Sequence, residues 1–400
     1  MREMELKVGG RSYYHSQFDE TTGTLVRDVE LARDIYSAPW DRLRRDSKDY
    51  EAFEKRYPRR HYSHTVFSPV PETVDVSITD KCHFGCTYCY QNSLPDLKHG
   101  PKDLVETIIK GFDQPPYQIA IGGGEPTLHP DLPYILRKAR ELGTVPNYTT
   151  AGDKISDRVI EATNEVCGGV AMTYHAFKGI DWFVEHYTKL KERLKVQLNV
   201  HLIADKDVAK NLAALVNAYK QLGSLSIVLL AYYPEVGRAT LDSLITKRVY
   251  MKDLPEAIKM ARSVRYKIAF SEGLLPYFLS RPELGVETRF AMPSEGFFSC
   301  YFNPKGQISQ SSFDPPRDES PTAFSEGSQK LWDDLYSHGS SPNGEACYSC
   351  KFSNRCSTPE TFHYFLCGFA KHNSIPLKEL PPPPPKTAYQ HLLENTDEEE

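Results

Sequence analysis

The sequence predicts an α/β protein built on a partial (β/α)6 barrel of the TIM-like kind, with an N-terminal extension and a cysteine-rich C-terminal domain. Three observations lead to this prediction. The length of 400 residues suits one large α/β domain with smaller additions. Short apolar runs alternate with longer amphipathic runs between about residues 72 and 265. Five of the nine cysteines lie between Cys300 and Cys367.

Composition and charge exclude several classes of protein. The formal net charge is −5 and 25% of the residues are charged, as in an ordinary globular chain. The longest apolar run, residues 227–233, is far shorter than the roughly 20 residues of a membrane helix. The first residues lack the pattern of a secretory signal, and the cysteine spacings indicate cofactor ligation in a reducing compartment. We therefore expect a cytoplasmic protein that binds neither membrane nor nucleic acid.

Residues 1–70 form the predicted N-terminal extension. Residues 6–29 suggest a hairpin that turns at Gly23, because glycine accepts the positive φ angle of such turns. Residues 41–60 suggest a helix with many charged side chains. A solvated helix face is the ordinary interpretation of such a stretch, and a surface that binds a partner is the alternative.

Residues 71–285 are predicted to form the barrel from six strand–helix units in series. Because no hairpin signal separates the strands, the series predicts a parallel sheet with right-handed crossovers. In such barrels the chemistry lies on loops at the carboxyl ends of the strands. The strands are expected at residues 74–78, 117–121, 145–149, 170–174, 196–203 and 225–232, and the helices at residues 104–112, 132–142, 157–162, 182–194, 208–222 and 254–264.

The periodicity fails after about residue 285. Residues 286–372 are rich in Ser, Pro, Gly and aromatic residues, which suggests a domain held by metal as much as by a core. Residues 373–400 contain five consecutive prolines, at positions 381–385, and an acidic end. They predict a stiff proline-rich segment and a disordered tail.

The first chemical motif is Cys82-x3-Cys86-x2-Cys89, directly after the first barrel strand. Three thiolates within eight residues can bind one inorganic centre, and iron–sulfur clusters are held by such thiolates. No fourth ligand lies nearby in the sequence, so one metal position would stay open for a substrate or cofactor. A zinc knuckle is the alternative interpretation.

The second motif, Gly123-Gly124-Glu125, follows the second strand. The glycines allow backbone groups to approach a ligand closely, and Glu125 adds an anion, so that the turn suits an ammonium group. One β-α-β step separates this turn from the cysteine loop. Both motifs are therefore expected at neighbouring strand ends of one barrel mouth.

Together these motifs resemble those of the radical SAM superfamily, over about residues 72–265, with Tyr88 directly before the third cysteine. The resemblance implies a [4Fe–4S] cluster on Cys82, Cys86 and Cys89, whose open iron binds the amino and carboxylate groups of S-adenosylmethionine. It implies that Gly123, Gly124 and Glu125 receive the methionine ammonium and that Tyr88 borders the adenine. Reductive cleavage, with a flavodoxin or ferredoxin as electron donor, would give a 5′-deoxyadenosyl radical that removes hydrogen from a substrate.

Further strand ends offer contacts to the cofactor or the substrate, with ordinary structural roles as the alternative for each. Many relatives have an Asn-Gly pair after the third strand, where this chain has Ala151-Gly152. The candidates are Thr149, Thr150, Gly152, Thr173, His175, Asn199 and His201 for the cofactor, and Tyr232, Tyr233 and Arg238 for the substrate.

Cys347-x2-Cys350-x5-Cys356, with Cys300 before it and Cys367 after it, resembles the auxiliary cluster domain called SPASM, or its shorter twitch form. The resemblance implies one auxiliary [4Fe–4S] cluster, because five thiols cannot fill two sites of four. The first three are expected ligands, and either Cys300 or Cys367 completes the site. The cysteine left over is an unused buried residue or a free thiol that donates a hydrogen atom during catalysis. A zinc ribbon is the alternative to the cluster.

Enzymes of this architecture commonly modify ribosomally synthesised peptides by crosslinking, epimerisation or dehydrogenation, so the resemblance implies a peptide maturase or oxidoreductase. A leader on the peptide would then contact the charged helix at residues 42–60. One alternative is oxidation or rearrangement of a small molecule, as in twitch-type dehydrogenases. The other is a non-catalytic metal-binding scaffold, which does not explain the glycine–glutamate motif at the second strand.

Overall fold

The computed structural model describes residues 1–8, 11–27, 68–233, 236–246, 248–271, 274, 277–278, 281–286, 298–313, 316 and 319–337. Three features expected from the sequence lie outside these residues. They are the charged helix at residues 41–60, the proline-rich tail, and Cys347, Cys350, Cys356 and Cys367. In the described part of the chain, no helix has the length and apolar character needed to cross a bilayer.

A small antiparallel sheet opens the chain. It has the order β1-β2-β3, with β1 at Arg2–Val8, β2 at Arg11–Asp19 and β3 at Thr24–Arg27. The turn expected at Gly23 joins β2 to β3, and its N–H donates to the carbonyl of Asp19 at 2.8 Å. β1 begins at Arg2, four residues before the hairpin expected over residues 6–29.

Alternate residues of β2 attach this sheet to the larger one. Tyr14 and Phe18 are buried, and the Phe18 ring stacks on Tyr117 with centroids 5.1 Å apart. The Tyr14 hydroxyl donates to Glu72, and the Arg2 guanidinium donates to the carbonyl of Gly143. Because these partners precede barrel strands, the small sheet covers the amino-terminal ends of those strands, opposite the barrel mouth.

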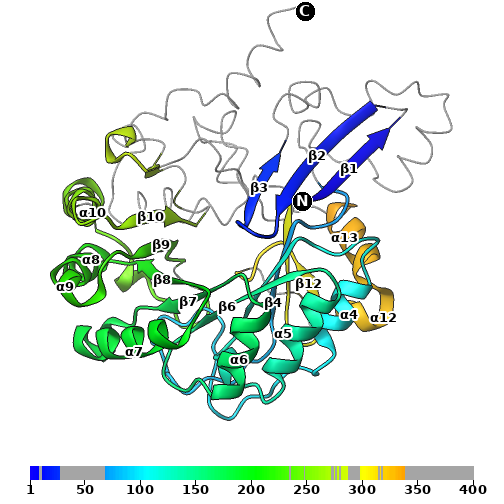
Figure 1. Cartoon of the computed structure of the whole chain (residues 1–400), viewed down its shortest axis with the longest axis horizontal. Coiled ribbons are helices and arrows are strands. Elements are labelled where there is room, and N and C mark those ends of the chain that lie inside the picture. Colours follow the sequence, from blue (N-terminus) through cyan, green and yellow to red (C-terminus); the bar gives the residue numbers. More distant parts are fainter. Residues whose placement is uncertain are drawn as a thin grey trace, which may run out of the picture.

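The main sheet has nine strands among the described residues, in the order β10-β9-β8-β7-β6-β5-β4-β11-β12 (Figure 1). All neighbouring pairs from β10 to β11 are parallel, as the series of strand–helix units predicts. The six expected strands are β4 at Thr73–Ser77, β5 at Gln118–Gly122, β6 at Val145–Thr150, β7 at Gly169–Thr173, β8 at Gln197–Ala204 and β9 at Ser226–Ala231.

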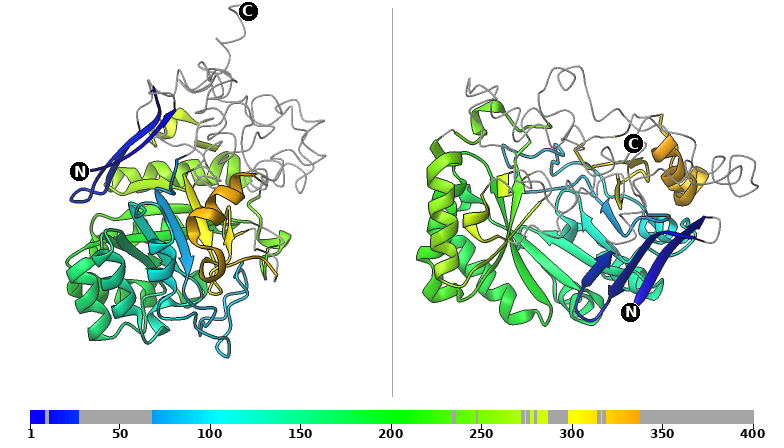
Figure 2. Two further views of the ribbon diagram at one scale, coloured as in Figure 1. Left: turned by 90° about the vertical axis from the view of Figure 1, so that its right-hand side faces the viewer. Right: turned by 90° about the horizontal axis from the view of Figure 1, so that it is seen from above.

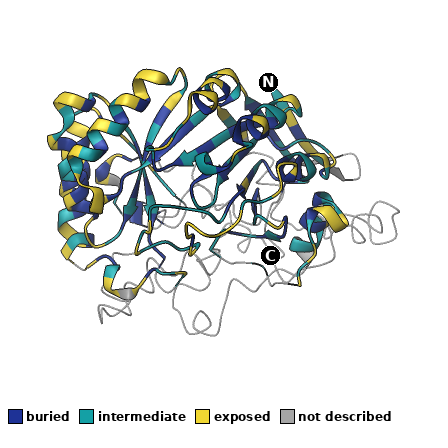
Figure 3. Ribbon diagram, turned by 90° about the horizontal axis from the view of Figure 1, so that it is seen from below, coloured by how far each residue is buried: buried dark blue, intermediate teal, exposed yellow. Residues whose placement is uncertain are grey.

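Helices lie along the outer face of this sheet, as Figures 1 and 2 show. Each long helix buries one stripe; in α5 the buried stripe is Leu132, Ile135, Leu136 and Ala139. The solvent-facing sides of the helices stay exposed (Figure 3). The helices between the strands are α4 at Leu104–Lys110, α5 at Leu132–Glu141, α6 at Asp157–Val166, α7 at Ile180–Arg193, α8 at Val208–Asn217, α9 at Tyr219–Leu222 and α10 at Leu254–Ser263.

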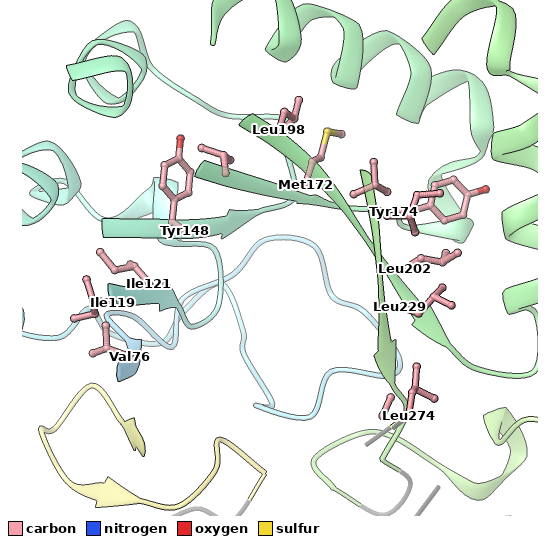
Figure 4. Close-up of a cluster of buried hydrophobic side chains, with 14 of the residues drawn as sticks. Val76, Ile119, Ile121, Tyr148, Met172, Tyr174, Leu198, Leu202, Leu229 and Leu274 are labelled. Carbon is pink, nitrogen blue, oxygen red and sulfur yellow. The ribbon is translucent and has the colours of Figure 1, made fainter. Parts of the chain in front are cut away.

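The two faces of the sheet differ in burial, and β8 shows the difference. Leu198, Val200 and Leu202 are buried toward the helices, whereas Asn199 and His201 between them are only half-buried. Figure 4 shows the apolar side chains of neighbouring strands gathered on the helix side. Because successive side chains of a strand point to opposite faces, the helix-covered face of the sheet is apolar and the inner face is more polar.

Three strands were not expected from the sequence: β10 at Lys267–Phe270, β11 at Ser299–Phe302 and β12 at Ile308–Ser309. β11 pairs in parallel with β4, the first barrel strand, and β12 pairs with β11 in an antiparallel hairpin. The expected domain boundary at residue 286 therefore separates two segments that share one sheet. Each of these strands is short, which is why periodicity alone did not reveal them.

The C-terminal end of the described chain packs on the first strand–helix unit. It consists of α12 at Ala323–Glu326 and α13 at Ser328–Ser337. Trp332 is fully buried and its Nε1 donates to the carbonyl of Ser68 at 3.2 Å. Gln329 N donates to the carbonyl of Gly111 at 2.8 Å, at the end of α4. This contact fixes the C-terminal segment to the edge of the barrel.

Candidate functional site

The three cysteines of the first motif lie on one loop, between β4 and α4, at the carboxyl end of β4. The loop is closed by backbone hydrogen bonds: Cys82 N donates to the carbonyl of Leu94 at 3.0 Å, and Gly100 N donates to that of Ile78 at 2.8 Å. Within it, Cys89 N donates to the carbonyl of Cys86 at 3.3 Å. All three cysteines are half-buried, and none of them forms a disulfide.

The charges of these thiols affect one another. Burial raises the pKa of Cys82, and it raises the pKa of Cys86 to about 11, with the other two cysteines adding to the effect. As thiolates they would therefore repel one another in a partly desolvated loop. A bound cation or metal cluster would offset that repulsion, because thiolate ligation of a metal removes the proton and neutralises the charge.

The loop offers three thiols to an inorganic centre. In an iron–sulfur cluster each thiolate binds a different iron, so Cys82, Cys86 and Cys89 would hold three irons of such a cluster. The zinc knuckle uses the same thiolate ligands and stays the alternative. Among the residues that the structure describes, no group of three or more His, Cys, Asp or Glu side chains is gathered around one point.

Tyr88 and His175 lie beside the second cysteine. The Tyr88 hydroxyl is 2.9 Å from His175 Nδ1, and Cys86 Sγ is 3.7 Å from the same nitrogen. Burial lowers the pKa of His175 to about 4, so its ring is neutral near pH 7 and can accept the phenolic proton. His175 is the second residue after β7, so it lies near the strand end at which the sequence places it. The contact holds the Tyr88 ring at the mouth.

The glycines of the second motif approach the cysteine loop itself. Gly124 N donates to the carbonyl of Thr79 at 2.7 Å, and Glu125 N donates to that of Lys81 at 2.9 Å. A Cβ at Gly123, where φ is +119°, would collide with the Thr79 carbonyl oxygen. A Cβ at Gly124 would collide with the Lys81 carbonyl oxygen. Both glycines are thus required for backbone packing, in addition to any ligand contact.

Glu125 is almost fully buried, and its carboxylate joins the ends of β5 and β6. Oε1 accepts from Thr127 N and from the hydroxyls of Thr127 and Thr150, at 3.1, 2.6 and 2.8 Å. Oε2 accepts from Ala151 N at 2.7 Å. Burial raises the pKa of Glu125, and these donors oppose that effect. Oε2 keeps acceptor capacity, and the Thr150 hydroxyl donates to Oε1 of this carboxylate.

The carbonyl oxygens of Gly123 and Gly124 complete the ammonium receptor expected at this turn. Within the described part of the chain, no hydrogen bond to either oxygen is present. Both follow the end of β5, beside the cysteine loop. Carbonyl oxygens are acceptors that an ammonium group requires. The assignment of Gly123, Gly124 and Glu125 to ammonium binding stays a prediction with this geometry behind it.

The structure places Asn199 early in β8, and its part in cofactor binding stays a prediction. Asn199 is the third residue of β8, and its Oδ1 accepts from Gln197 Nε2 at 2.7 Å, at the amino end of the strand. Ala204, the last residue of β8, lies five positions further along the strand, which is roughly 16 Å at about 3.3 Å per residue. The alternation of β8 puts Asn199 on the inner face of the sheet. Thr173, by contrast, ends β7 and is half-buried beside His201.

The substrate candidates after β9 are engaged within the protein. The Tyr232 hydroxyl donates to the carbonyl of Thr240 at 2.8 Å and accepts from Thr240 N at the same distance. The Tyr233 ring lies 4.0 Å from that of Phe313, which also contacts Tyr90 at 4.4 Å. Phe313 thus links the end of the sixth barrel strand to the cysteine loop.

Asp205 and Asp153 are polar residues of the mouth that sequence reasoning missed. Asp205 directly follows β8, and burial raises its pKa to about 6. Its charge acts on both Tyr88 and Tyr232. Asp153 Oδ2 is 2.7 Å from His83 Nε2 and ties the loop after β6 to the cysteine loop. A carboxylate directly after an alternating strand was the signal that could have identified Asp205.

Cys300 lies in β11, and the structure does not support a role for it at the mouth. It is paired in register with Val74 of β4, is 1% exposed and belongs to the apolar core. Neighbouring Tyr301 points to the other face, where its hydroxyl donates to Ser77 at 2.8 Å. The Cys300 thiol is on the helix side of the sheet, as the alternative of an unused buried cysteine would have it, and its role as ligand or hydrogen-atom donor stays a prediction. Cys167 is buried, as expected.

The chain resembles known proteins in both sequence and fold. Residues 76–270 match the model of the Radical SAM superfamily. Over 104 residues the chain is 31% identical to the PqqA peptide cyclase of Ruegeria pomeroyi, covering 24% of this chain and 27% of that protein. Over 106 residues it is 30% identical to the GTP 3',8-cyclase of Chlorobaculum tepidum, covering 24% and 31%. The chain thus spans under a third of either relative's length.

Two solved structures share the fold over longer stretches. SuiB of Streptococcus suis, bound to its precursor peptide SuiA, superposes with a TM-score of 0.62 at 13% identity, covering 86% of this chain and 91% of SuiB. The structure of anSMEcpe, with AdoMet and a peptide bound, superposes with a TM-score of 0.50 at 14% identity, covering 76% of this chain and 100% of that chain. At these identities the similarity shows the fold.

Proposed function

This chain is a radical SAM enzyme whose radical SAM domain spans residues 76–270, and we propose that it modifies a ribosomally synthesised peptide. The observation that carries the chemistry is the cysteine loop at the end of β4, packed against the two glycines at the end of β5. The loop offers three thiols to a [4Fe–4S] cluster, and the glycine carbonyls offer acceptors to the ammonium of S-adenosylmethionine.

Held by Cys82, Cys86 and Cys89 and by the carbonyls of Gly123 and Gly124, the cluster and S-adenosylmethionine would supply the radical chemistry that removes a hydrogen atom from the substrate. The chain's own contribution is binding and orientation. Glu125 holds the ends of β5 and β6 in place, and His175 fixes the Tyr88 ring at the mouth beside the thiols. Electrons would come from a flavodoxin or ferredoxin.

The proteins that this chain resembles in sequence and fold favour a peptide substrate. The PqqA peptide cyclase is among its relatives in sequence, and SuiB and anSMEcpe, both solved with peptides, share its fold. We propose crosslinking, epimerisation or dehydrogenation as the reaction, with residues 1–70 available to a leader. A small-molecule substrate is the second candidate, since the GTP 3',8-cyclase is a relative of similar identity.

One auxiliary [4Fe–4S] cluster belongs to this proposal, in a domain at residues 286–372. Because Cys300 is packed in the core, Cys367 is the better fourth ligand beside Cys347, Cys350 and Cys356. Two clusters would give about eight irons per chain. Iron and sulfide analysis of anaerobic protein tests this number, and a zinc-containing protein with about four irons would contradict it.

The decisive experiment is anaerobic reconstitution of the full chain with iron, sulfide, dithionite and S-adenosylmethionine. The substrates are synthetic peptides encoded beside the gene and, separately, purine nucleotides. We expect 5′-deoxyadenosine, together with a peptide that has lost the mass of two hydrogens or has gained deuterium from heavy water. The triple variant Cys82→Ala, Cys86→Ala, Cys89→Ala should form no 5′-deoxyadenosine.

The matched control is Cys167→Ala, because this cysteine is buried between α6 and β7, on the far side from the mouth. It should keep the activity of the unchanged chain. If the triple variant cleaves S-adenosylmethionine as fast as this control, the radical SAM site is wrongly assigned. If only the nucleotides are changed, the small-molecule candidate replaces the peptide.

A further inference from the structure

The segment after β9 lies directly on the cysteine loop, and one residue holds that loop at two points. Arg238 N donates to the carbonyl of Cys89 at 2.9 Å. Its guanidinium Nη2 donates to the carbonyl of Ser93 at 3.1 Å. Arg238 thus spans the stretch that begins at the third cysteine, although the two segments are far apart in the chain.

The backbone before Arg238 allows this approach only with glycine. Gly237 has φ at +58°, and a Cβ there would collide with the carbonyl oxygen of Tyr90 and lie 2.6 Å from that of Cys89. Ala239 N donates to the carbonyl of Val236 at 3.0 Å and closes the turn. The turn at residues 236–239, which we name the Arg238 turn, therefore presses against the cluster-binding loop.

The Arg238 guanidinium brings a positive charge into this half-buried region. Its Nε is buried and has no hydrogen-bond partner, and its backbone N–H is bonded to the carbonyl of Cys89. Burial of an unpaired charge costs free energy, so such groups are normally paired. No carboxylate within the described ranges forms an ion pair with Arg238. An anionic thiolate-bound cluster on the loop would provide the missing negative charge.

We propose that Arg238 is a positioning residue with two effects on the cluster: it holds the Cys89 end of the loop, and its charge stabilises the reduced form. The inference rests on the proposed function. A reduced cluster carries one more negative charge than an oxidised cluster, so a fixed cation nearby stabilises the reduced state more. Net charge, hydrogen bonding and burial are the properties through which a protein sets a cluster's potential.

The test separates the charge from the anchor by means of three variants of the full chain. Arg238→Gln removes the charge, Arg238→Lys keeps it, and Gly237→Ala disturbs the turn while Arg238 stays in place. Arg137→Gln is the matched control, because it removes an arginine that pairs with Glu165 at the exposed surface. Iron content and a redox titration followed by electron paramagnetic resonance are measured for each. The signal of this loop is the one that the Cys82→Ala, Cys86→Ala, Cys89→Ala variant lacks.

We expect Arg238→Gln to shift the midpoint potential of that signal to more negative values, with Arg238→Lys and Arg137→Gln close to the unchanged chain. Gly237→Ala should lose iron. Equal shifts in the Gln and Lys variants, or no shift in either, would overturn the role of the charge. If Arg238→Gln binds no iron, the Lys variant decides: restored iron and potential support the proposal, and continued loss contradicts it. If the unchanged chain binds no cluster, the proposed function fails instead.

Discussion

Glu125 accepts four hydrogen bonds inside the protein, and this saturation governs what its substitution should do. A glutamine keeps the size but turns one oxygen into an N–H donor, and either orientation points that donor at Ala151 N or at the donors on Oε1. A buried donor without an acceptor costs about 1–3 kcal/mol. Glu125 therefore has a structural role whether or not it also contacts a ligand.

For Glu125→Gln we expect the free energy of unfolding to fall by about 1–3 kcal/mol, measured by urea denaturation. Glu165→Gln is the control, since Glu165 forms an exposed pair with Arg137 that is worth under about 1 kcal/mol. Binding of S-adenosylmethionine is measured in parallel. Unchanged stability with weakened binding would show that the carboxylate serves the ammonium alone.

For Asp205, removal of the charge is expected to raise the free energy of unfolding, the opposite of the effect at Glu125. Burial raises its pKa from 3.8 to about 6, nearby Asp207 adds to the rise, and Lys206 and the Asp207 N–H oppose it. Because the folded-state pKa is above the unfolded value, the folded state holds the proton more tightly between these pH values. Stability from this group is therefore greatest below about pH 4 and is lost as the pH rises through about 6.

We expect Asp205→Asn to raise the free energy of unfolding at pH 7.5 by roughly 1–3 kcal/mol and to flatten its dependence between pH 4 and 6. The amide oxygen can still accept from Asp207 N, which now meets Asp205 Oδ1 at 2.9 Å. Glu161→Gln, on the exposed face of α6, should leave the pH profile unchanged. A profile of Asp205→Asn that parallels the unchanged chain would contradict the assignment.

At the level of elements, the cysteine loop is held by two turns that each pack a glycine against it. The turn after β5 supports the Cys82 end through Gly124, and the Arg238 turn supports the Cys89 end through Gly237. In both places a carbonyl oxygen of the loop lies close to the glycine and accepts a hydrogen bond from the backbone N–H of that glycine or of the residue after it. A loop that binds a cluster needs this rigidity, because the thiols must stay in place when no metal is bound.

Gly124→Ala should therefore weaken cluster binding, because the new methyl group collides with the Lys81 carbonyl and lies 3.0 Å from the Cys82 Cβ. We expect lower iron content after gel filtration and faster hydrogen exchange of the loop amides. Gly122→Ala is a close control: it is two residues away, and a Cβ there meets nothing within 4 Å. Equal iron retention in the two variants would show that the loop adapts to the methyl group.

At the level of the whole molecule, both ends of the described chain pack on the first strands of the barrel. The small N-terminal sheet contacts Tyr117 and Glu72, and β11 extends the main sheet next to β4. Trp332 closes this assembly, with its ring fully buried and its Nε1 bonded to Ser68. The barrel and its additions should therefore unfold together.

Trp332→Ala is expected to cost about 3–5 kcal/mol and to lower the midpoint of a single thermal transition, measured by circular dichroism. Met260→Ala, which removes a side chain 41% exposed on α10, should have little effect. The iron site and the secondary structure should be lost at the same temperature. A separate early transition that leaves the iron site intact would show that the C-terminal segment folds independently.

The order and type of the barrel elements, and the two motifs at neighbouring strand ends, follow from the sequence alone. The sequence carries three local signals: alternation with a period of two, helical stripes and the spacing of the cysteines. The first two indicate which residues are buried, and the third indicates which cysteines can bind one centre. All six expected strands are present, each with bounds within a residue or two. Cys82, Cys86 and Cys89 share one loop beside Gly124, as their positions in the series require.

Only the tertiary structure decided what these groups meet. Periodicity does not state which distant backbone lies opposite a glycine, so the approach of Gly237 to Cys89 and the four partners of Glu125 were not foreseeable. It also does not mark how far along a long strand a residue lies from the mouth, as with Asn199 near the start of β8. β11 joins β4 through hydrogen bonds between segments more than 200 residues apart. Such pairing depends on three-dimensional closure of the sheet, which no local pattern encodes.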